Sequence, residues 1–232
     1  MTDHFQNIYA TQAAEYHRMI AVEDVDGNLL PALERVTPLS GKRVLDLGSG
    51  SGRIPLLVAE RAVQVLALDL SRAMLREQKV QREKAGGCWH IVQADMRQLP
   101  LLDHWADVVV AGWAIGHLRG WFDVDWKRQI GLVLEEMHRA AVSGGALIIL
   151  ETMTTGSLTP APPTAELAEY YEWLEGNWGF SCQVIRTDYQ FSSVEEAVAY
   201  TEFFFGTELA AVIRRHGWAR LPEWTGVWGK VV

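Results

Sequence analysis

Val44-Leu45-Asp46-Leu47-Gly48-Ser49-Gly50-Ser51-Gly52-Arg53 is the stretch that decides the fold of this chain. An apolar segment runs into an acidic residue and then meets glycines at three alternate positions, with an amphipathic segment beyond them. Glycine lets a backbone turn tightly and lets a ligand approach where a Cβ atom would collide. A strand that enters such a turn and continues into a helix is typical of doubly wound α/β proteins, which bind nucleotides at the carboxyl ends of their strands.

The length and composition favour a single globular domain. The chain has 232 residues, of which 49% are hydrophobic and 22% are charged. No apolar run approaches the ~20 residues that span a bilayer, and the first residues lack the basic and then apolar layout of a signal peptide. We therefore expect one domain over residues 1–232, located in the cytoplasm and without a membrane span.

Charge and metal-binding patterns exclude several classes of partner. The formal net charge of −8 argues against a nucleic-acid binder, which relies on clustered Lys and Arg. Cys88 and Cys182 form no C-x-x-C pair, and the histidines form no H-x-x-x-H or H-E-x-x-H pattern. We expect no metal and no disulfide, with both cysteines as free buried thiols.

Apolar runs alternate with helical patterns, which predicts parallel strands joined by helical crossovers. Helical periodicity before the first strand predicts an N-terminal helical cap over residues 1–40, ahead of a cofactor-binding core at 41–151. The expected strands lie near 43–47, 63–68, 88–93, 105–110 and 146–151, and the expected helices near 53–61, 71–84 and 124–141.

Residues 152–232 are less regular, and we expect them to form the substrate-side region. Three prolines in the stretch 152–163 predict a long loop. Alternation over 182–191 predicts a strand, 193–215 predicts a helix interrupted near Gly206, and 223–232 predicts a closing strand.

The glycine spacing does not fit a dinucleotide-binding loop. A G-x-G-x-x-G pattern that starts at Gly48 would need its third glycine at Arg53, and one that starts at Gly50 would need it at Pro55. This argues against a nicotinamide or flavin dinucleotide. What remains is a D-x-G-x-G-x-G pattern that begins at Asp46.

Two more acidic residues follow the next two predicted strands. Asp69 ends the second strand, where a carboxylate can accept both hydrogens of a ribose diol. Asp95 follows the third strand, where it can accept the exocyclic amine of adenine while Met96 lies against the ring. Because no Lys or Arg cluster waits for phosphate, these residues predict a pocket for an adenosine that carries no phosphate and has a positive charge.

The sequence resembles the class I S-adenosylmethionine-dependent methyltransferases of the small-molecule type related to quinone-biosynthesis C-methyltransferases. VLDLGSGSGR is similar to the first motif of the family and ALDLSRAML to the second. QADMRQLPLLDHWADVVVAGWAIGHL and LEEMHRAAVSGGALIILE match the stretches that follow, in the family's order. The resemblance covers about residues 40–151 and does not extend to the last ~80 residues.

This resemblance implies a Rossmann-like, seven-stranded and mostly parallel sheet with a variable C-terminal part. The family usually ends in a β-hairpin with an antiparallel last strand, so the helical stretch 193–215 would be an insertion. The implied cofactor is S-adenosylmethionine, with S-adenosylhomocysteine as product and no metal. The implied cofactor-binding residues are Asp46, Gly48, Ser49, Gly50, Asp69, Leu70, Asp95, Met96, Ala111, Gly112 and Trp113.

Fewer features of the sequence point to the residues that would contact the methyl acceptor. His117 follows the fourth strand where a substrate can arrive, as a catalytic base or as a packing residue. Tyr16, Arg186 and Tyr189 are the candidate substrate residues. We expect His117, Trp113 and at least one of these three to face the space beside the cofactor sulfur.

These observations predict methyl transfer to a small organic acceptor, by a monomer or a homodimer. The acceptor and the atom that is methylated stay open at this point. The alternatives are a module that binds the cofactor without turnover and a methyltransferase that acts on a macromolecule. Residues 111–114 read AGWA rather than the [D/N]PP[Y/F] of base-amino methylases, which argues against nucleic acid.

Overall fold

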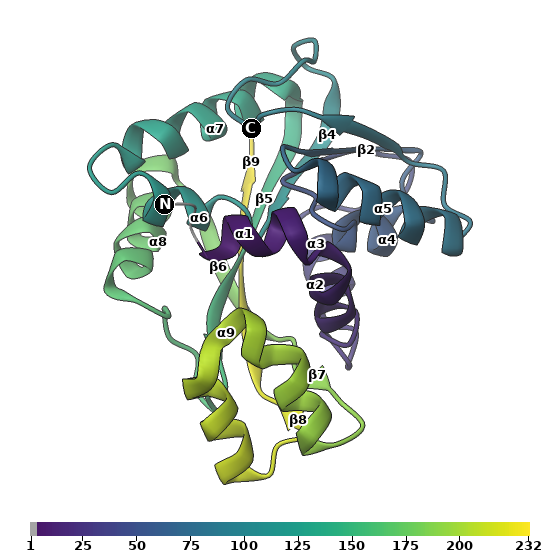
Figure 1. Cartoon of the computed structure of the whole chain (residues 1–232). Helices are drawn as coiled ribbons and strands as arrows, with labels where there is room; N and C mark the ends of the chain where they lie inside the picture. Colours follow the sequence, from purple (N-terminus) through teal and green to yellow (C-terminus); the bar gives the residue numbers. More distant parts are fainter. Residues whose placement is uncertain (1–3) are drawn as a thin grey trace.

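A seven-stranded sheet forms the centre of the computed structural model, which describes residues 4–232 (Figure 1). The strands of this sheet are β1 (Arg43–Leu47), β2 (Gln64–Asp69), β3 (His90–Gln93), β4 (Ala106–Gly112), β5 (Ala141–Thr155), β6 (Ser181–Arg186) and β9 (Glu223–Val231). A second, two-stranded sheet contains β7 (Tyr189–Gln190) and β8 (Arg220–Leu221). The helices are α1 (His4–Thr11), α2 (Ala13–Ile20), α3 (Leu29–Val36), α4 (Arg53–Val58), α5 (Arg72–Lys84), α6 (Gly116–Trp121), α7 (Trp126–Ala140), α8 (Ala165–Trp178) and α9 (Val194–His216).

The strand order β3-β2-β1-β4-β5-β9-β6 confirms the predicted doubly wound sheet. Neighbouring strands from β3 to β5 are parallel, whereas β9 runs antiparallel to both β5 and β6. The chain order reverses between β1 and β4, and a ligand crevice opens at such a point beyond the carboxyl ends of the strands. The predicted site residues at the ends of β1, β2, β3 and β4 therefore lie along one edge.

The central strands are buried on both faces, which explains their continuous apolar runs. Leu45 and Leu47 of β1 face a core that α7 and α8 cover. Val44 faces the opposite core, which α3 and α4 cover. Alternate residues of one strand thus serve two cores, and the sheet is a rigid base for the residues at its edge.

The C-terminal part departs from the predicted elements in two places. β5 continues to Thr155, so residues 152–155 are strand rather than loop, and the proline-containing loop begins after them. α8 follows that loop and was not predicted. Its start is capped by the Thr164 hydroxyl, which accepts a hydrogen bond from the Leu167 N–H.

The long ends of β5 and β9 carry a separate lobe that contains α9, β7 and β8 (Figure 1). A third core joins this lobe to α2, with Met19 packed near Tyr189 and Phe191. The predicted single strand over 182–191 is wrong, since β6 pairs with β9 and β7 pairs with β8. The prediction of an interrupted helix is confirmed, because Gly206 breaks α9 with a φ of 82°. α9 lies in sequence between β6 and the antiparallel β9, as the resemblance implied.

The two cysteines are free but not buried. Cys88 and Cys182 are both exposed. Their thiols lie next to β3 and on the edge strand β6, where side chains reach the surface. The sequence expectation of buried thiols is therefore wrong.

Candidate active site

A cavity of about 690 Å³ opens at the carboxyl ends of the central strands. α1 and α2 contribute part of its wall, so the N-terminal segment covers the edge of the sheet at which the predicted residues lie (Figure 1). Most of the predicted cofactor-binding residues line it, namely Asp46, Gly48, Ser49, Gly50, Asp69, Leu70, Asp95, Met96, Gly112 and Trp113. Its size falls within the range of sites that bind small molecules.

The turn after β1 requires glycine for steric reasons. Gly48 has a φ of 65°, and a Cβ atom at this position would lie 2.4 Å from the Ala114 Cβ atom. Gly52 has a φ of 98° and stands directly before α4, where the Gln78 side chain fills the space beside it. Glycine is therefore needed at both positions for the positive φ and for the close packing of Ala114 and Gln78 against the turn.

Asp46 is a buried carboxyl group with no partner. Its side chain is 1% exposed, and neither carboxylate oxygen accepts a hydrogen bond among the described residues. Burial, and to a lesser degree the nearby Asp69, raises its pKa well above the ordinary value. A buried acid without a partner is costly unless a ligand supplies one. An ammonium group of a ligand is the partner that these two oxygens fit.

Asp69 is held in place by the backbone on both sides. Its Oδ2 atom accepts the Gly50 N–H at 2.8 Å, and its Oδ1 atom accepts the Ser71 N–H at 2.7 Å. Burial raises its pKa, while these backbone hydrogen bonds act in the opposite direction. Each oxygen keeps a second lone pair, so the carboxylate can also accept from a pair of ligand hydroxyls.

Asp95 is ion-paired within the structure. The Arg97 guanidinium donates to both of its oxygens, with the shortest distance 2.6 Å between Nη2 and Oδ2. This pairing lowers the pKa of Asp95 despite partial burial. Leu70 and Met96 line the same end of the cavity and provide apolar surface for a flat ring.

The end of β4 contributes one strained residue. Trp113 has a φ of 51°, which is uncommon for a residue with a side chain and is concentrated at functional sites. Its N–H donates to the Leu150 carbonyl at 2.7 Å. Ala111, by contrast, is fully buried in the core and is not part of the cavity wall. Its prediction as a cofactor-contacting residue is not supported by its position.

His117 and Tyr9 meet in the wall of the same cavity. The Tyr9 hydroxyl lies 2.8 Å from His117 Nε2, and either atom can carry the hydrogen between them. The His117 ring stacks on Trp121 at 5.2 Å between centroids and 12° between planes. His117 comes from α6, and Tyr9 comes from α1, far away in the sequence.

The three candidate substrate residues lie in different parts of the structure. Tyr16 lines the cavity, and burial raises its pKa to about 12. Arg186 and Tyr189 are not among the residues of the cavity wall, which corrects the prediction for both. The expected set of His117, Trp113 and one flanking residue is thus present in the wall, with Tyr16 as the flanking residue.

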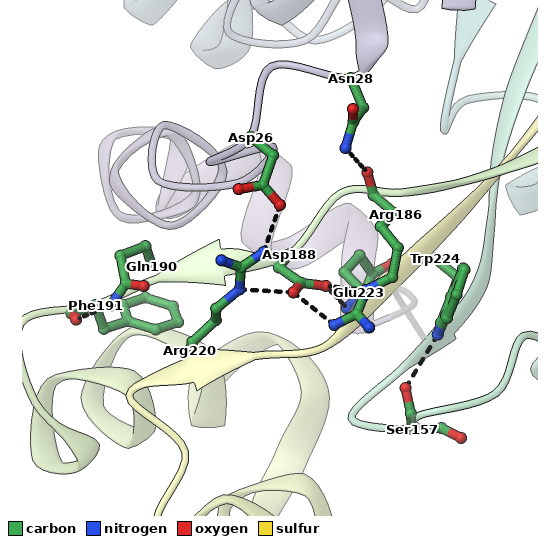
Figure 2. A network of polar contacts seen from close by, with 10 residues as sticks. All are labelled: Asp26, Asn28, Ser157, Arg186, Asp188, Gln190, Phe191, Arg220, Glu223 and Trp224. Atoms are coloured by element: carbon green, nitrogen blue, oxygen red, sulfur yellow. Dashed lines mark hydrogen bonds and ion pairs between the residues drawn. The ribbon is translucent and has the colours of Figure 1, made fainter.

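Arg186 instead belongs to a polar network that centres on Asp188 (Figure 2). Its Nη2 atom lies 2.6 Å from Asp188 Oδ2, and Arg220 Nε donates to the same oxygen at 2.8 Å. The Glu223 N–H donates to the other Asp188 oxygen. Burial opposes ionisation of Asp188, but the hydrogen bonds from the two guanidinium groups outweigh it and lower the pKa.

Among the wall residues that the sequence analysis did not single out, Arg53 and Trp121 have side chains suited to a functional role. Arg53 was used only to exclude a dinucleotide motif, yet it lines the cavity beside Trp113. Trp121 also lines it, and its spacing of four from His117 on a helix was a usable signal.

The site has the donors and acceptors that an adenosine with a cationic side chain requires. The unpartnered oxygens of Asp46 and the anchored carboxylate of Asp69 both fit that chemistry. Fold and site together thus define a methyltransferase-type, cofactor-binding α/β protein.

Comparisons with known proteins agree with this class. Residues 45–149 match the family described as "Methyltransferase domain". A demethylmenaquinone methyltransferase of Thermobifida fusca is 30% identical over 195 residues, which cover 80% of this chain and 72% of that protein. The chain therefore belongs to the class I S-adenosylmethionine-dependent methyltransferases.

Two other similarities extend this comparison. A malonyl-[acyl-carrier protein] O-methyltransferase of Pseudescherichia vulneris is 32% identical over 149 residues, which cover 64% of this chain. The match spans about half the length of that relative, 52%. The crystal structure of a SAM-dependent methyltransferase from Aquifex aeolicus superposes with a TM-score of 0.58 at 16% identity, and the match covers 92% of each chain. At that identity the likeness supports the fold alone.

Within residues 4–232, no helix combines the length and the apolar character needed to cross a membrane. The same residues contain no group of three or more His, Cys, Asp or Glu side chains that could hold a metal ion. That the reaction uses no metal stays a prediction from the sequence and from the family resemblance.

Proposed function

We propose that this protein transfers a methyl group from S-adenosylmethionine to a small organic acceptor and releases S-adenosylhomocysteine. The observation that carries the proposal is Asp46, a residue of the cavity wall whose two buried oxygens have no partner in the described chain. Such a site suits the ammonium of the methionine moiety, since a charged partner would offset the cost of burying the acid. Family membership supports the same cofactor.

The remaining cofactor contacts follow from the positions of the side chains. We assign the ribose hydroxyls to Asp69 and the adenine ring to Leu70 and Met96, with Asp95 at its amine. Gly112 and Trp113 border the sulfur. When bound, the sulfonium supplies a methyl group that is already activated for displacement. The chain's own contribution is to hold the acceptor in line with it, and such positioning accounts for much of the acceleration in reactions of this kind.

Several aromatic side chains line the cavity, and we assign them to the acceptor. Tyr9, Tyr16, Trp113 and Trp121 all belong to its wall, and broad apolar rings of this kind favour a flat or apolar acceptor. The Tyr9–His117 pair is the proton-transferring group that we assign to an acceptor that must lose a proton. Demethylmenaquinone, named for the Thermobifida fusca relative above, is the first acceptor to test.

Calorimetric titration with S-adenosylmethionine and S-adenosylhomocysteine tests the proposal directly. We expect both to bind the wild-type protein, and Asp46→Asn to weaken binding about 10- to 100-fold, because a charged hydrogen bond is lost. Asp107→Asn is the matched control, since Asp107 bonds Arg43 at the opposite end of the sheet. A wild-type protein that binds neither ligand would refute the proposal. Equal losses of affinity in Asp46→Asn and Asp107→Asn would refute it as well.

Turnover needs a second experiment. We expect label from methyl-labelled S-adenosylmethionine to appear on a compound in a small-metabolite extract and on neither protein nor nucleic acid. A protein that binds the cofactor but labels nothing would be the non-catalytic binding module.

A further inference from the structure

Trp113 is held by a contact on one face of its ring. The Arg53 guanidinium lies 3.9 Å from the centroid of the indole, within the range of a strong cation–π contact. Both residues line the cavity, and Trp113 has the strained backbone described above. A strained conformation persists only where its surroundings fix it. The Arg53 guanidinium packs on the indole ring of this residue, and the Leu150 carbonyl accepts its N–H.

Arg53 is in turn fixed by Glu23. Its Nη1 atom lies 2.7 Å from Glu23 Oε2, in an ion pair whose side chains are only 15% and 3% exposed. Glu23 follows α2 in the N-terminal segment, whereas Arg53 begins α4. The contact therefore ties the cap to the glycine turn, and it leaves Arg53 with a neutralising partner in a place that water reaches poorly.

This charge balance matters for the cofactor that the cavity is proposed to hold. S-adenosylmethionine has a positive sulfur, and S-adenosylhomocysteine has a neutral one, while the two share the rest of their structure. An unpaired guanidinium beside Trp113 would repel the methyl donor but not the product. Repulsion between like charges is large where the effective dielectric constant is low.

We propose that Glu23 sets the discrimination between methyl donor and product by neutralising Arg53 where it packs on Trp113. The inference rests on the proposed cofactor. Glu23 is a positioning residue in this scheme, because it acts on the ligand only through Arg53. The ion pair lets the cavity keep a planar cation that orients the indole without expelling a cationic ligand.

The test is the ratio of the two dissociation constants, measured by calorimetry in the Glu23→Gln variant. Glutamine keeps the size and an acceptor oxygen but removes the charge. We expect binding of S-adenosylmethionine to weaken on the order of tenfold relative to S-adenosylhomocysteine, as a unit charge ~10 Å away does at an effective dielectric constant of about 20.

Two further variants separate charge from structure. In Glu23→Gln/Arg53→Met both charges are absent, so the ratio should return to within about twofold of the wild-type value. Glu136→Gln is the matched control, because Glu136 pairs with Arg139 and is not part of the cavity wall. It should leave the ratio unchanged.

Three outcomes would overturn the inference. One is an unchanged ratio in Glu23→Gln, and another is an equal loss of both ligands, which would make Glu23 merely structural. The third is a double variant that fails to restore the ratio. A wild-type protein that binds neither ligand would instead refute the proposed function itself, so the two failures are distinguishable.

Discussion

At the scale of single residues, Glu151 is the buried acid with the clearest consequence for pH. It ends the buried part of β5, is 5% exposed, and accepts the Gly116 N–H at 2.7 Å. This hydrogen bond fixes the start of α6, the helix that presents His117 to the cavity. A Cβ atom at Gly116 would lie 2.9 Å from Glu151 Oε2, so the two residues fit only as this pair.

Burial raises the pKa of Glu151 from 4.5 to about 8, although the Gly116 hydrogen bond acts against it. Between these two pH values the folded protein keeps a proton that the unfolded chain releases. The contribution of Glu151 to the free energy of unfolding should therefore be fully present below about pH 4.5 and be lost as the pH rises to about 8, on the order of a few kcal/mol.

Urea denaturation of the wild type and Glu151→Gln across this pH range measures the effect. Glutamine does not titrate, so the stability of the variant relative to the wild type should increase with pH. Glu135→Gln, which removes an exposed acid of α7, should follow the wild-type curve. Parallel curves for the wild type and Glu151→Gln would contradict the prediction.

At the scale of elements, the kink in α9 is set by one glycine. Gly206 has a φ of 82° and a ψ of 176°, a conformation that residues with a side chain essentially do not adopt. Phe204 lies just before the kink and packs against Phe5 and Tyr16 of the cap. The kink thus lets α9 reach the segment that covers the cavity.

Gly206→Ala should destabilise the protein by about 1–3 kcal/mol, because alanine is strained in this conformation. Gly176→Ala in α8 is the matched control. A Cβ atom there meets nothing within 4 Å, and the residue lies in a regular helix, so alanine should stabilise by up to about 1 kcal/mol. Chemical denaturation measures both. A neutral or stabilising Gly206→Ala would show that the kink is not needed.

At the scale of the whole molecule, Asp188 joins three parts of the chain (Figure 2). Arg186 ends β6 of the main sheet, Arg220 belongs to the small sheet, and Glu223 begins β9. Arg220 also donates a hydrogen bond to Asp26, and the Asn28 side-chain amide donates one to the Arg186 carbonyl. The N-terminal segment therefore belongs to the same network. The acid therefore fixes how the lobe with α9 sits against the sheet and the cap.

Asp188→Asn should lower the free energy of unfolding by about 2–4 kcal/mol, since it removes the charge from a fully buried acid that pairs with two arginines. Glu15→Gln breaks an exposed pair with Arg18 and should cost less than 1 kcal/mol. Urea denaturation compares the two. If both variants lose less than about 1 kcal/mol of unfolding free energy, the contacts of Asp188 do not stabilise the packing of these parts.

Much of the sheet, and several side chains of the cavity wall, were predictable because the signals are local. Asp46, Asp69 and Asp95 each lie within two residues of the carboxyl end of a strand, and parallel strands bring such positions to one edge. The interruption at Gly206 was visible for the same reason. The division of residues 182–191 between β6 and β7 could not be predicted, because strand alternation does not reveal which partner strand each half will pair with.

The sequence by itself determined the fold class, the family and the edge of the sheet at which a cofactor would bind, since backbone periodicity and glycine geometry act over a few residues. Only the tertiary structure decided which distant side chains come together in the rest of the cavity wall. Tyr9 meets His117, and Glu23 meets Arg53, across long separations in the chain. Arg186 and Tyr189 were placed elsewhere by their pairing and burial. Such contacts depend on how helices pack over the sheet, which no local pattern encodes.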